Sequence, residues 1–214
     1  MKRALLPFIA TFMVILTGSC RQDLTVSSPD GRIKVALSVE GGSLGYSISV
    51  DSSAFILNSP LGLEAERFNL AGDFAVVGIR KCSHNESWTM PWGENKVIRD
   101  SHNELVATFK NPGKVSLTIR VRAFDDGVGF RYEYDVPADS VKITDEKTGF
   151  CFAQDGTSWS IPANFGTYEL LYRTLPISGV ENANTPFTLK TESGIYARSA
   201  RKPRLSLRTR VISG

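Results

Sequence analysis

The fold class of this 214-residue chain is decided by the segment RVRAFDDGVGFRYEY, which runs from Arg120 to Tyr134. Apolar side chains recur at every second position on both sides of an Asp-Gly pair, as Val121, Phe130 and Tyr132 show. Period-two alternation is typical of a strand with one buried face, and Asp-Gly favours a tight turn between two strands. The segment therefore predicts a β-hairpin that starts an antiparallel sheet.

The two predicted strands each have a polar face and an apolar face. The polar positions between the apolar ones are Arg120, Arg122, Arg131 and Glu133. In an antiparallel sheet this pattern leaves one face polar and buries the other in the core. Two glycines, Gly127 and Gly129, bracket Val128. Because glycine lacks a Cβ atom, we expect these two positions to adopt positive φ or to pack closely against a neighbour.

The rest of the chain from Leu24 onwards repeats this pattern of short strands and turns. Residues 32–39 alternate strictly, and the turn signals Pro29-Asp30-Gly31 and Gly41-Gly42 flank them. No helical period of useful length occurs after the first twenty residues. Regular short strands separated by Gly and Pro are typical of an all-β sandwich or barrel, and the length favours one domain.

The net charge of +3 does not indicate a nucleic-acid-binding protein. Eight of the 25 basic side chains lie among the first three residues and residues 198–210, and no acidic residue follows Glu192. The body of the chain is therefore mildly acidic. Bulk basicity that is confined to the two ends does not predict a nucleic-acid-binding face, so we expect no nucleic-acid partner.

Residues 1–20 have the pattern of a bacterial signal peptide. A basic start is followed by the apolar run 4–16, and small residues then lead into Cys20. The apolar run is short for a membrane span, and a cysteine directly after a small-residue cleavage site resembles a lipobox. We expect lipidation of Cys20 and export as a periplasmic or outer-membrane lipoprotein, with plain secretion as the alternative. The lipid anchor is then the only expected contact with a membrane.

The remaining cysteines and the histidines predict no metal site. Cys82 and Cys151 can either form a disulfide or stay as buried, unpaired thiols, since no short spacing requires a bridge. His84 and His102 are the only histidines, and neither has a partner at ligand spacing in the sequence. A histidine-dependent hydrolytic triad is not expected either.

Two tryptophans, Trp88 and Trp92, lie four residues apart next to a Gly-Glu pair. Exposed indole rings suit the apolar faces of sugars, so the two residues are candidates for binding a carbohydrate substrate. The alternative is that both rings fill the core of a sandwich or a seam between domains. Trp159, in a loop-rich segment with aromatic anchors, is a further candidate.

Several motifs together resemble the N-terminal region of glycoside hydrolase family 97, α-glucosidases and α-galactosidases common in gut Bacteroidetes. The segments that carry the resemblance, in the order of the family, are 28–31, 59–63, 88–99, 103–105, 124–133, 159–172 and 184–186. The resemblance implies an antiparallel β-supersandwich of the galactose-mutarotase type over residues 21–196. In the family this domain packs against a catalytic (β/α)₈ barrel that acts on α-linked glucosides or galactosides.

The resemblance also implies which catalytic and metal-binding residues to expect in this chain. A (β/α)₈ barrel takes about 250 residues, more than this whole chain, so the barrel and the family's catalytic carboxylates are missing. No catalytic residue is therefore expected here. Glu169 matches the glutamate that the family's N-terminal domain gives to a calcium ion, whose other carboxylate ligands belong to the barrel. A free-standing carbohydrate-binding module and a non-functional gene fragment are the alternatives.

The last segment, residues 197–214, departs from the family pattern. It is rich in arginine and serine and contains no acidic residue. A frameshift or truncation explains why alternation and core residues stop together, and it predicts a sandwich that is incomplete at its C-terminal end. The alternative is a basic arm that contacts nucleic acid or a membrane.

Overall fold

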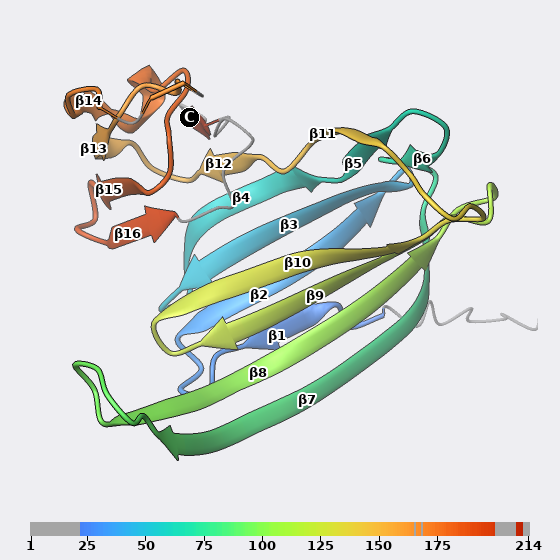
Figure 1. The fold of residues 1–214 in the computed structure, drawn as a ribbon, viewed down its shortest axis with the longest axis horizontal. Coiled ribbons are helices and arrows are strands. Elements are labelled where there is room, and N and C mark those ends of the chain that lie inside the picture. The colour runs from blue at the N-terminus through green and yellow to red at the C-terminus, as the bar shows by residue number, and fades with distance from the viewer. Residues whose placement is uncertain (1–21, 165, 168, 200–208, 212–214) are drawn as a thin grey trace, which may run out of the picture.

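The computed structural model describes residues 22–164, 166–167, 169–199 and 209–211. This part of the chain consists of strands and loops, with one short 3₁₀ turn, η1 (Ile177–Gly179), and no α-helix. The strands form two large sheets that lie face to face and two smaller ones (Figure 1). All strand pairs are antiparallel except the β12–β17 pair. The prediction of an all-β antiparallel sandwich is confirmed.

The first large sheet has the strand order β1-β2-β3-β4-β12-β17. Its strands are β1 (Thr25–Ser27), β2 (Ile33–Glu40), β3 (Ser43–Val50), β4 (Ser53–Leu61), β12 (Phe150–Phe152) and β17 (Thr209–Val211). The strictly alternating segment 32–39 of the sequence forms β2. Its inward side chains, Val35 and Leu37, are buried because this face of the sheet packs against the second sheet.

The second large sheet has the strand order β10-β9-β8-β7 and contains the predicted hairpin. Its strands are β7 (Ala75–Thr89), β8 (Val97–Lys110), β9 (Ser116–Phe124) and β10 (Gly127–Asp135). β9 and β10 pair from Phe124↔Gly127 onwards, so Asp125 and Asp126 form a two-residue turn. The hairpin is confirmed, and it belongs to a sheet that two long strands extend to one side.

The expectation for the hairpin glycines is wrong. Neither Gly127 nor Gly129 has positive φ, and a Cβ atom at either position meets nothing within 4 Å. The space beside both glycines, on the outer face of the sheet, is therefore open. Positive φ and close approach occur instead at Gly156, where φ is +156° and a Cβ atom would lie 2.1 Å from the Lys190 carbonyl oxygen.

The core lies between the two large sheets. Leu105, Phe109 and Leu117 of the second sheet are fully buried, and they belong to one cluster with Val35 and Tyr46 of the first sheet. The Tyr46 hydroxyl donates a hydrogen bond to the Gly149 carbonyl oxygen at 2.9 Å, which satisfies the polar end of a buried ring. The apolar residues that alternate in the sequence therefore make a contiguous core.

Two smaller sheets complete the described structure. One contains β11 (Ile143–Glu146), β5 (Leu63–Ala65) and β6 (Asn69–Leu70), and the other contains β14 (Arg173–Pro176), β13 (Gly156–Ser160), β15 (Phe187–Thr191) and β16 (Tyr196–Ser199). The second of these lies at one end of the sandwich (Figure 1). β16 pairs with β15 as far as Ser199, so three residues of the predicted tail continue a strand. No helix of the described residues is long and apolar enough to span a membrane.

Candidate functional site

Glu169 lies on the loop between β13 and β14 and is exposed. Its backbone N–H donates a hydrogen bond to the Thr167 hydroxyl oxygen at 3.0 Å. The three following residues, Leu170, Leu171 and Tyr172, are 39%, 87% and 60% exposed. The structure therefore presents this carboxylate beside an uncovered apolar surface, which the sequence pattern did not predict.

The base of this loop is held by the segment that precedes β15. The Asn184 N–H donates to the Ile161 carbonyl oxygen at 2.9 Å, and the Ala163 N–H donates to Asn182 Oδ1 at 3.2 Å. The Asn184 side-chain amide nitrogen is buried and has no hydrogen-bond partner among the residues that the structure describes. One backbone and one side-chain acceptor thus tie the start of the loop to the segment before β15, and the Asn184 amide donor in that segment is unsatisfied among the described residues.

Calcium coordination needs more oxygen atoms than Glu169 supplies. The ion takes six to eight oxygen ligands, and a carboxylate provides at most two of them. Within the described ranges, no three His, Cys, Asp or Glu side chains gather as a metal site. Glu169 is exposed, and the described residues around it do not complete a site of six to eight oxygen atoms by themselves.

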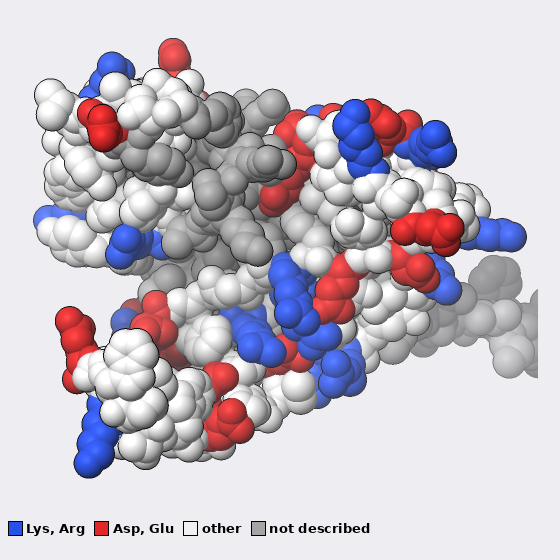
Figure 2. All heavy atoms as spheres, in the orientation of Figure 1, with Lys and Arg blue, Asp and Glu red and all other residues white. Residues whose placement is uncertain are grey.

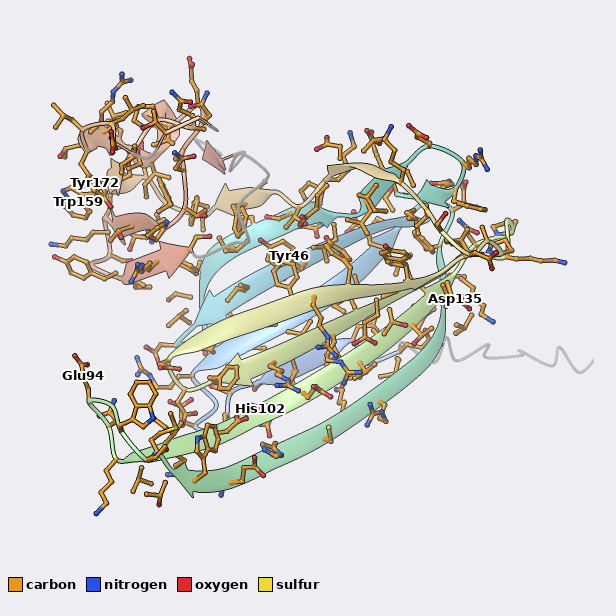
Figure 3. All side chains as sticks on the ribbon, in the orientation of Figure 1. Tyr46, Glu94, His102, Asp135, Trp159 and Tyr172 are labelled. Atoms are coloured by element: carbon orange, nitrogen blue, oxygen red, sulfur yellow. The ribbon has the colours of Figure 1, made fainter. Side chains whose placement is uncertain are left out.

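The two candidate tryptophans lie at the end of the β7–β8 hairpin, which projects from the sandwich (Figure 3). Trp88, the penultimate residue of β7, is 43% exposed, and Trp92, in the turn, is 83% exposed. The alternative that they fill the sandwich core is therefore wrong. Trp159 lies elsewhere, half-buried in β13, and its backbone pairs with Thr174 and Thr188.

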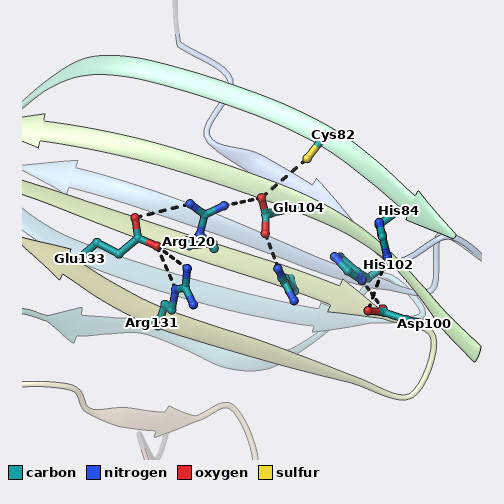
Figure 4. A network of polar contacts seen from close by, with 9 residues as sticks. Cys82, His84, Asp100, His102, Glu104, Arg120, Arg131 and Glu133 are labelled. Carbon is teal, nitrogen blue, oxygen red and sulfur yellow. Dashed lines mark hydrogen bonds and ion pairs between the residues drawn. The ribbon is translucent and has the colours of Figure 1, made fainter. Parts of the chain in front are cut away.

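A network of ion pairs covers the outer face of the second large sheet (Figure 4). Glu104 of β8 is only 5% exposed, and its two oxygens accept hydrogen bonds from Arg120 Nη1 at 2.6 Å and Arg122 Nε at 2.9 Å. Arg120 also donates to Glu133 at 2.8 Å, and Arg131 pairs with the same Glu133 oxygen at 2.7 Å. The predicted polar face of the hairpin is thus confirmed as an interstrand network.

The arginines decide the protonation state of both carboxylates. Burial raises the pKa of Glu104, but the Arg122 hydrogen bond and the Arg120 charge outweigh burial, so the pKa falls below its ordinary value. Hydrogen bonds from Arg120 and Arg131 lower the pKa of Glu133. Acidic and basic side chains lie intermixed over this face (Figure 2). Carboxylates that stay ionised in this way stabilise the sheet and are poor general acids.

The two histidines meet although they are eighteen residues apart. His84 of β7 and His102 of β8 are direct cross-strand partners, and their ring centroids lie 5.1 Å apart. His102 is buried against Phe124, with its Nδ1 2.5 Å from Asp100 Oδ1. Spacing along one strand could not reveal this pair. Only the register in which β7 pairs with β8 brings the two histidines together, and the sequence alone did not establish that register.

The cysteines remain separate thiols. Cys82 and Cys151 are both free, so the disulfide alternative is wrong for this structure. The expectation that both are buried is also wrong, because Cys82 is exposed on the edge strand β7. Its Sγ lies 3.7 Å from Glu104 Oε1, at the margin of the ion-pair network. The predicted lipidation site, Cys20, lies outside the described residues.

A family profile described as glycosyl-hydrolase 97 N-terminal matches residues 26–199. A structure of a glycoside hydrolase family 97 enzyme from Pseudoalteromonas sp. strain K8, in complex with panose, is similar with a TM-score of 0.75 and 37% identity. Another from that strain, in complex with acarbose, gives the same values, and each match covers 80% of this chain and 27% of the solved one.

Two more distant proteins also match the chain. A probable retaining α-galactosidase from Streptomyces bingchenggensis (strain BCW-1) is 26% identical over 139 residues, which are 63% of this chain and 22% of that protein. A β-arabinopyranosidase structure shares the fold, with a TM-score of 0.69 and 22% identity over 79% of this chain and 30% of its own. The chain thus spans less than a third of the length of these relatives.

Proposed function

Because the chain belongs to glycosyl-hydrolase family 97, whose N-terminal domain it matches over residues 26–199, we propose that it is the non-catalytic β-sandwich of an α-glycosidase. In this role it braces a catalytic (β/α)₈ barrel and contributes to the carbohydrate and calcium site. Alone it does not hydrolyse glycosides, because glycoside hydrolysis needs a pair of carboxyl groups around the scissile bond. In the family that the chain resembles, this pair of carboxyl groups lies on the barrel.

The observation that carries this proposal is the position of Glu169 beside Leu171 and Tyr172. A calcium ligand of a shared site must be exposed in the absence of its partner, and Glu169 is exposed. An apolar surface that a second domain covers must also be uncovered here, as Leu171 is at 87% and Tyr172 at 60% exposure. Calcium, when bound, supplies a positive charge at the boundary between the two domains.

The relatives support a proposal for the substrate class. The solved enzymes of the same family hold panose and acarbose, and another relative bears the name of an α-galactosidase. We infer that the enzyme to which this domain belongs acts on α-linked glucosides or galactosides.

A chimera tests the proposed function. Residues 24–199 replace the matching part of the Pseudoalteromonas family 97 enzyme, and hydrolysis of α-linked p-nitrophenyl glucoside and galactoside is measured with and without calcium. We expect activity from the chimera, none from the purified chain, and a higher calcium requirement in the chimera with Glu169→Gln. Hydrolysis by the chain alone, or an unchanged calcium requirement in the variant, contradicts the proposal.

We further infer export as a lipoprotein, supported by the apolar run before Cys20. Cells that express the chain are labelled with radioactive palmitate, and the chain is expected to carry the label in the membrane fraction. Cys20→Ala should abolish labelling. Equal labelling of this variant, or no labelling of either chain, removes the inference.

A further inference from the structure

The end of the β7–β8 hairpin carries four exposed apolar side chains. Trp88, Met90, Trp92 and Val97, which we call the tip patch, are 43%, 38%, 83% and 61% exposed. They lie within ten residues of sequence, around the turn that joins the two longest strands. Monomeric proteins rarely expose such a group of large apolar side chains unless another surface covers it.

Hydrogen bonds within the hairpin hold the turn and two side chains of the tip patch in place. The Met90 N–H donates to the Lys96 carbonyl oxygen at 2.8 Å, which closes the turn. The Trp88 indole N–H points to Met90 Sδ at 3.3 Å, so these two side chains support each other. A partner that binds here meets a turn and two side chains that are already ordered, which lowers the entropic cost of docking.

The tip patch lies on the same side of the molecule as the Glu169 loop. In Figure 3, Glu94 marks the hairpin turn and Tyr172 marks the loop, and both lie at one end of the sandwich, whereas Asp135 lies at the other. Seven of the eleven large apolar side chains that are exposed in the described residues belong to these two segments. The uncovered apolar surface is thus concentrated at one end.

We propose that the tip patch is a second docking point for the same catalytic barrel that covers the Glu169 loop. This inference rests on the proposed function and adds a contact more than seventy residues away in sequence. The matched region is only 27% of the solved family enzyme, so most of that protein is available to cover both segments. Two separated contacts fix the orientation of one rigid body on another better than one contact does.

A carbohydrate is the less favoured occupant of the tip patch. Sugars stack on aromatic rings, but Met90 and Val97, which contribute half of the patch, offer no ring. Aliphatic and thioether side chains beside two indoles match the composition of an interface between protein surfaces. The geometry therefore favours an apolar protein surface over an oligosaccharide.

The test uses the chimera with the Pseudoalteromonas enzyme and the full chain in parallel. Trp92→Ser should lower the Tm of the chimera, because a contact with the barrel is lost, and leave the Tm of the full chain within about 1 °C. Tyr134→Ser is the matched control, because Tyr134 is an aromatic residue of the same sheet with 44% exposure, next to Asp135 at the opposite end. It should not change the difference in Tm between the two proteins.

An unchanged Tm of the Trp92→Ser chimera overturns the inference. So does quenching of tryptophan fluorescence when the full chain is titrated with maltotetraose, if Trp92→Ser abolishes it, because the occupant is then a sugar. These outcomes differ from failure of the proposed function, which is read from activity and from the calcium requirement of Glu169→Gln.

A second fusion protein provides the test if the chimera does not fold. Residues 88–97 are grafted into the corresponding hairpin of the intact Pseudoalteromonas enzyme, with either Trp92 or Ser at that position. The inference expects a lower Tm for the graft with Ser, and equal Tm values overturn it.

Discussion

Replacing Glu104 by Gln tests whether the outer face of the second sheet contributes to stability. The substitution keeps the size of the side chain and removes its charge. Arg120 and Arg122, which donate to the two Glu104 oxygens at 2.6 and 2.9 Å, then face a neutral amide. An amide has one acceptor oxygen, so one of these guanidinium groups meets an N–H₂ group instead of an acceptor.

The expected loss is about 2–3 kcal/mol of unfolding free energy. A hydrogen bond to a charged group contributes about 1.5–3 kcal/mol, and Glu104 makes two such bonds. The sum is reduced because the Arg122 side chain is 45% exposed and can be rehydrated, and because Arg120 keeps its pairing with Glu133. The estimate is still larger than for an exposed ion pair, because the Glu104 side chain is 6% exposed.

Urea unfolding at pH 7 measures this loss. The matched control is Glu64→Gln, which removes the carboxylate that pairs with Lys147 at 2.5 Å in a contact where both side chains are more than a third exposed. An exposed pair contributes less than about 1 kcal/mol, so the control should stay near wild type. A Glu104→Gln protein within about 0.5 kcal/mol of wild type refutes the reasoning.

The pH dependence provides an independent check. Burial raises the pKa of Glu104, the arginines lower it by more, and the folded pKa lies below the ordinary value of 4.5. A carboxylate with a lowered folded pKa stabilises the fold above its unfolded pKa and loses this contribution as the pH falls through the folded pKa. The difference between wild type and Glu104→Gln should therefore shrink below about pH 4.5. A difference that is constant from pH 7 to pH 3 contradicts the assignment.

Three further predictions concern the core and the thiols. Gly156→Ala places a methyl group 2.1 Å from a carbonyl oxygen of β15 and should cost about 2–3 kcal/mol in urea unfolding. Tyr46→Phe removes the hydrogen bond to the Gly149 carbonyl oxygen and should cost about 1–2 kcal/mol, with no change of the sheet signal in circular dichroism. Exposed Cys82 should react with Ellman's reagent in the folded chain faster than part-buried Cys151, and equal rates contradict the burial difference.

The sequence predicts the sandwich well where one face of a strand is buried. Residues 32–39 and the hairpin around Asp125 and Asp126 alternate, because each inward side chain enters the core. The long strand β7 is harder to predict, since it is an edge strand and most of its side chains are exposed. Its sequence therefore carries little alternation, and its length of 15 residues follows only from its pairing with β8.

The candidate site is less predictable, because its parts come together only through register and loop conformation. Glu104, Arg120 and Glu133 belong to three strands, and nothing in their spacing shows that they share one network. The exposure of Trp92 was one of two alternatives from the sequence, and the hairpin turn decides between them. The role proposed for Glu169 rests on the family resemblance and not on its local residues.

Under the proposed function, the separation of these features suits a sandwich that packs against a catalytic domain. Its ion-pair network occupies the outer face of the second sheet, where Glu104 is already satisfied by two arginines and offers a ligand no free charge. Among the described residues, groups that lack a partner lie elsewhere: the buried Asn184 amide, the apolar side chains that follow Glu169, and the tip patch. An unsatisfied buried donor and uncovered apolar area both raise the free energy of the isolated domain, and a second surface lowers it by covering them. Because the hairpin turn at Glu94 and the loop at Tyr172 lie at one end of the sandwich, one contact can cover both apolar segments under the proposed function, and Glu169 then enters that contact on a loop whose base is tied to the segment before β15.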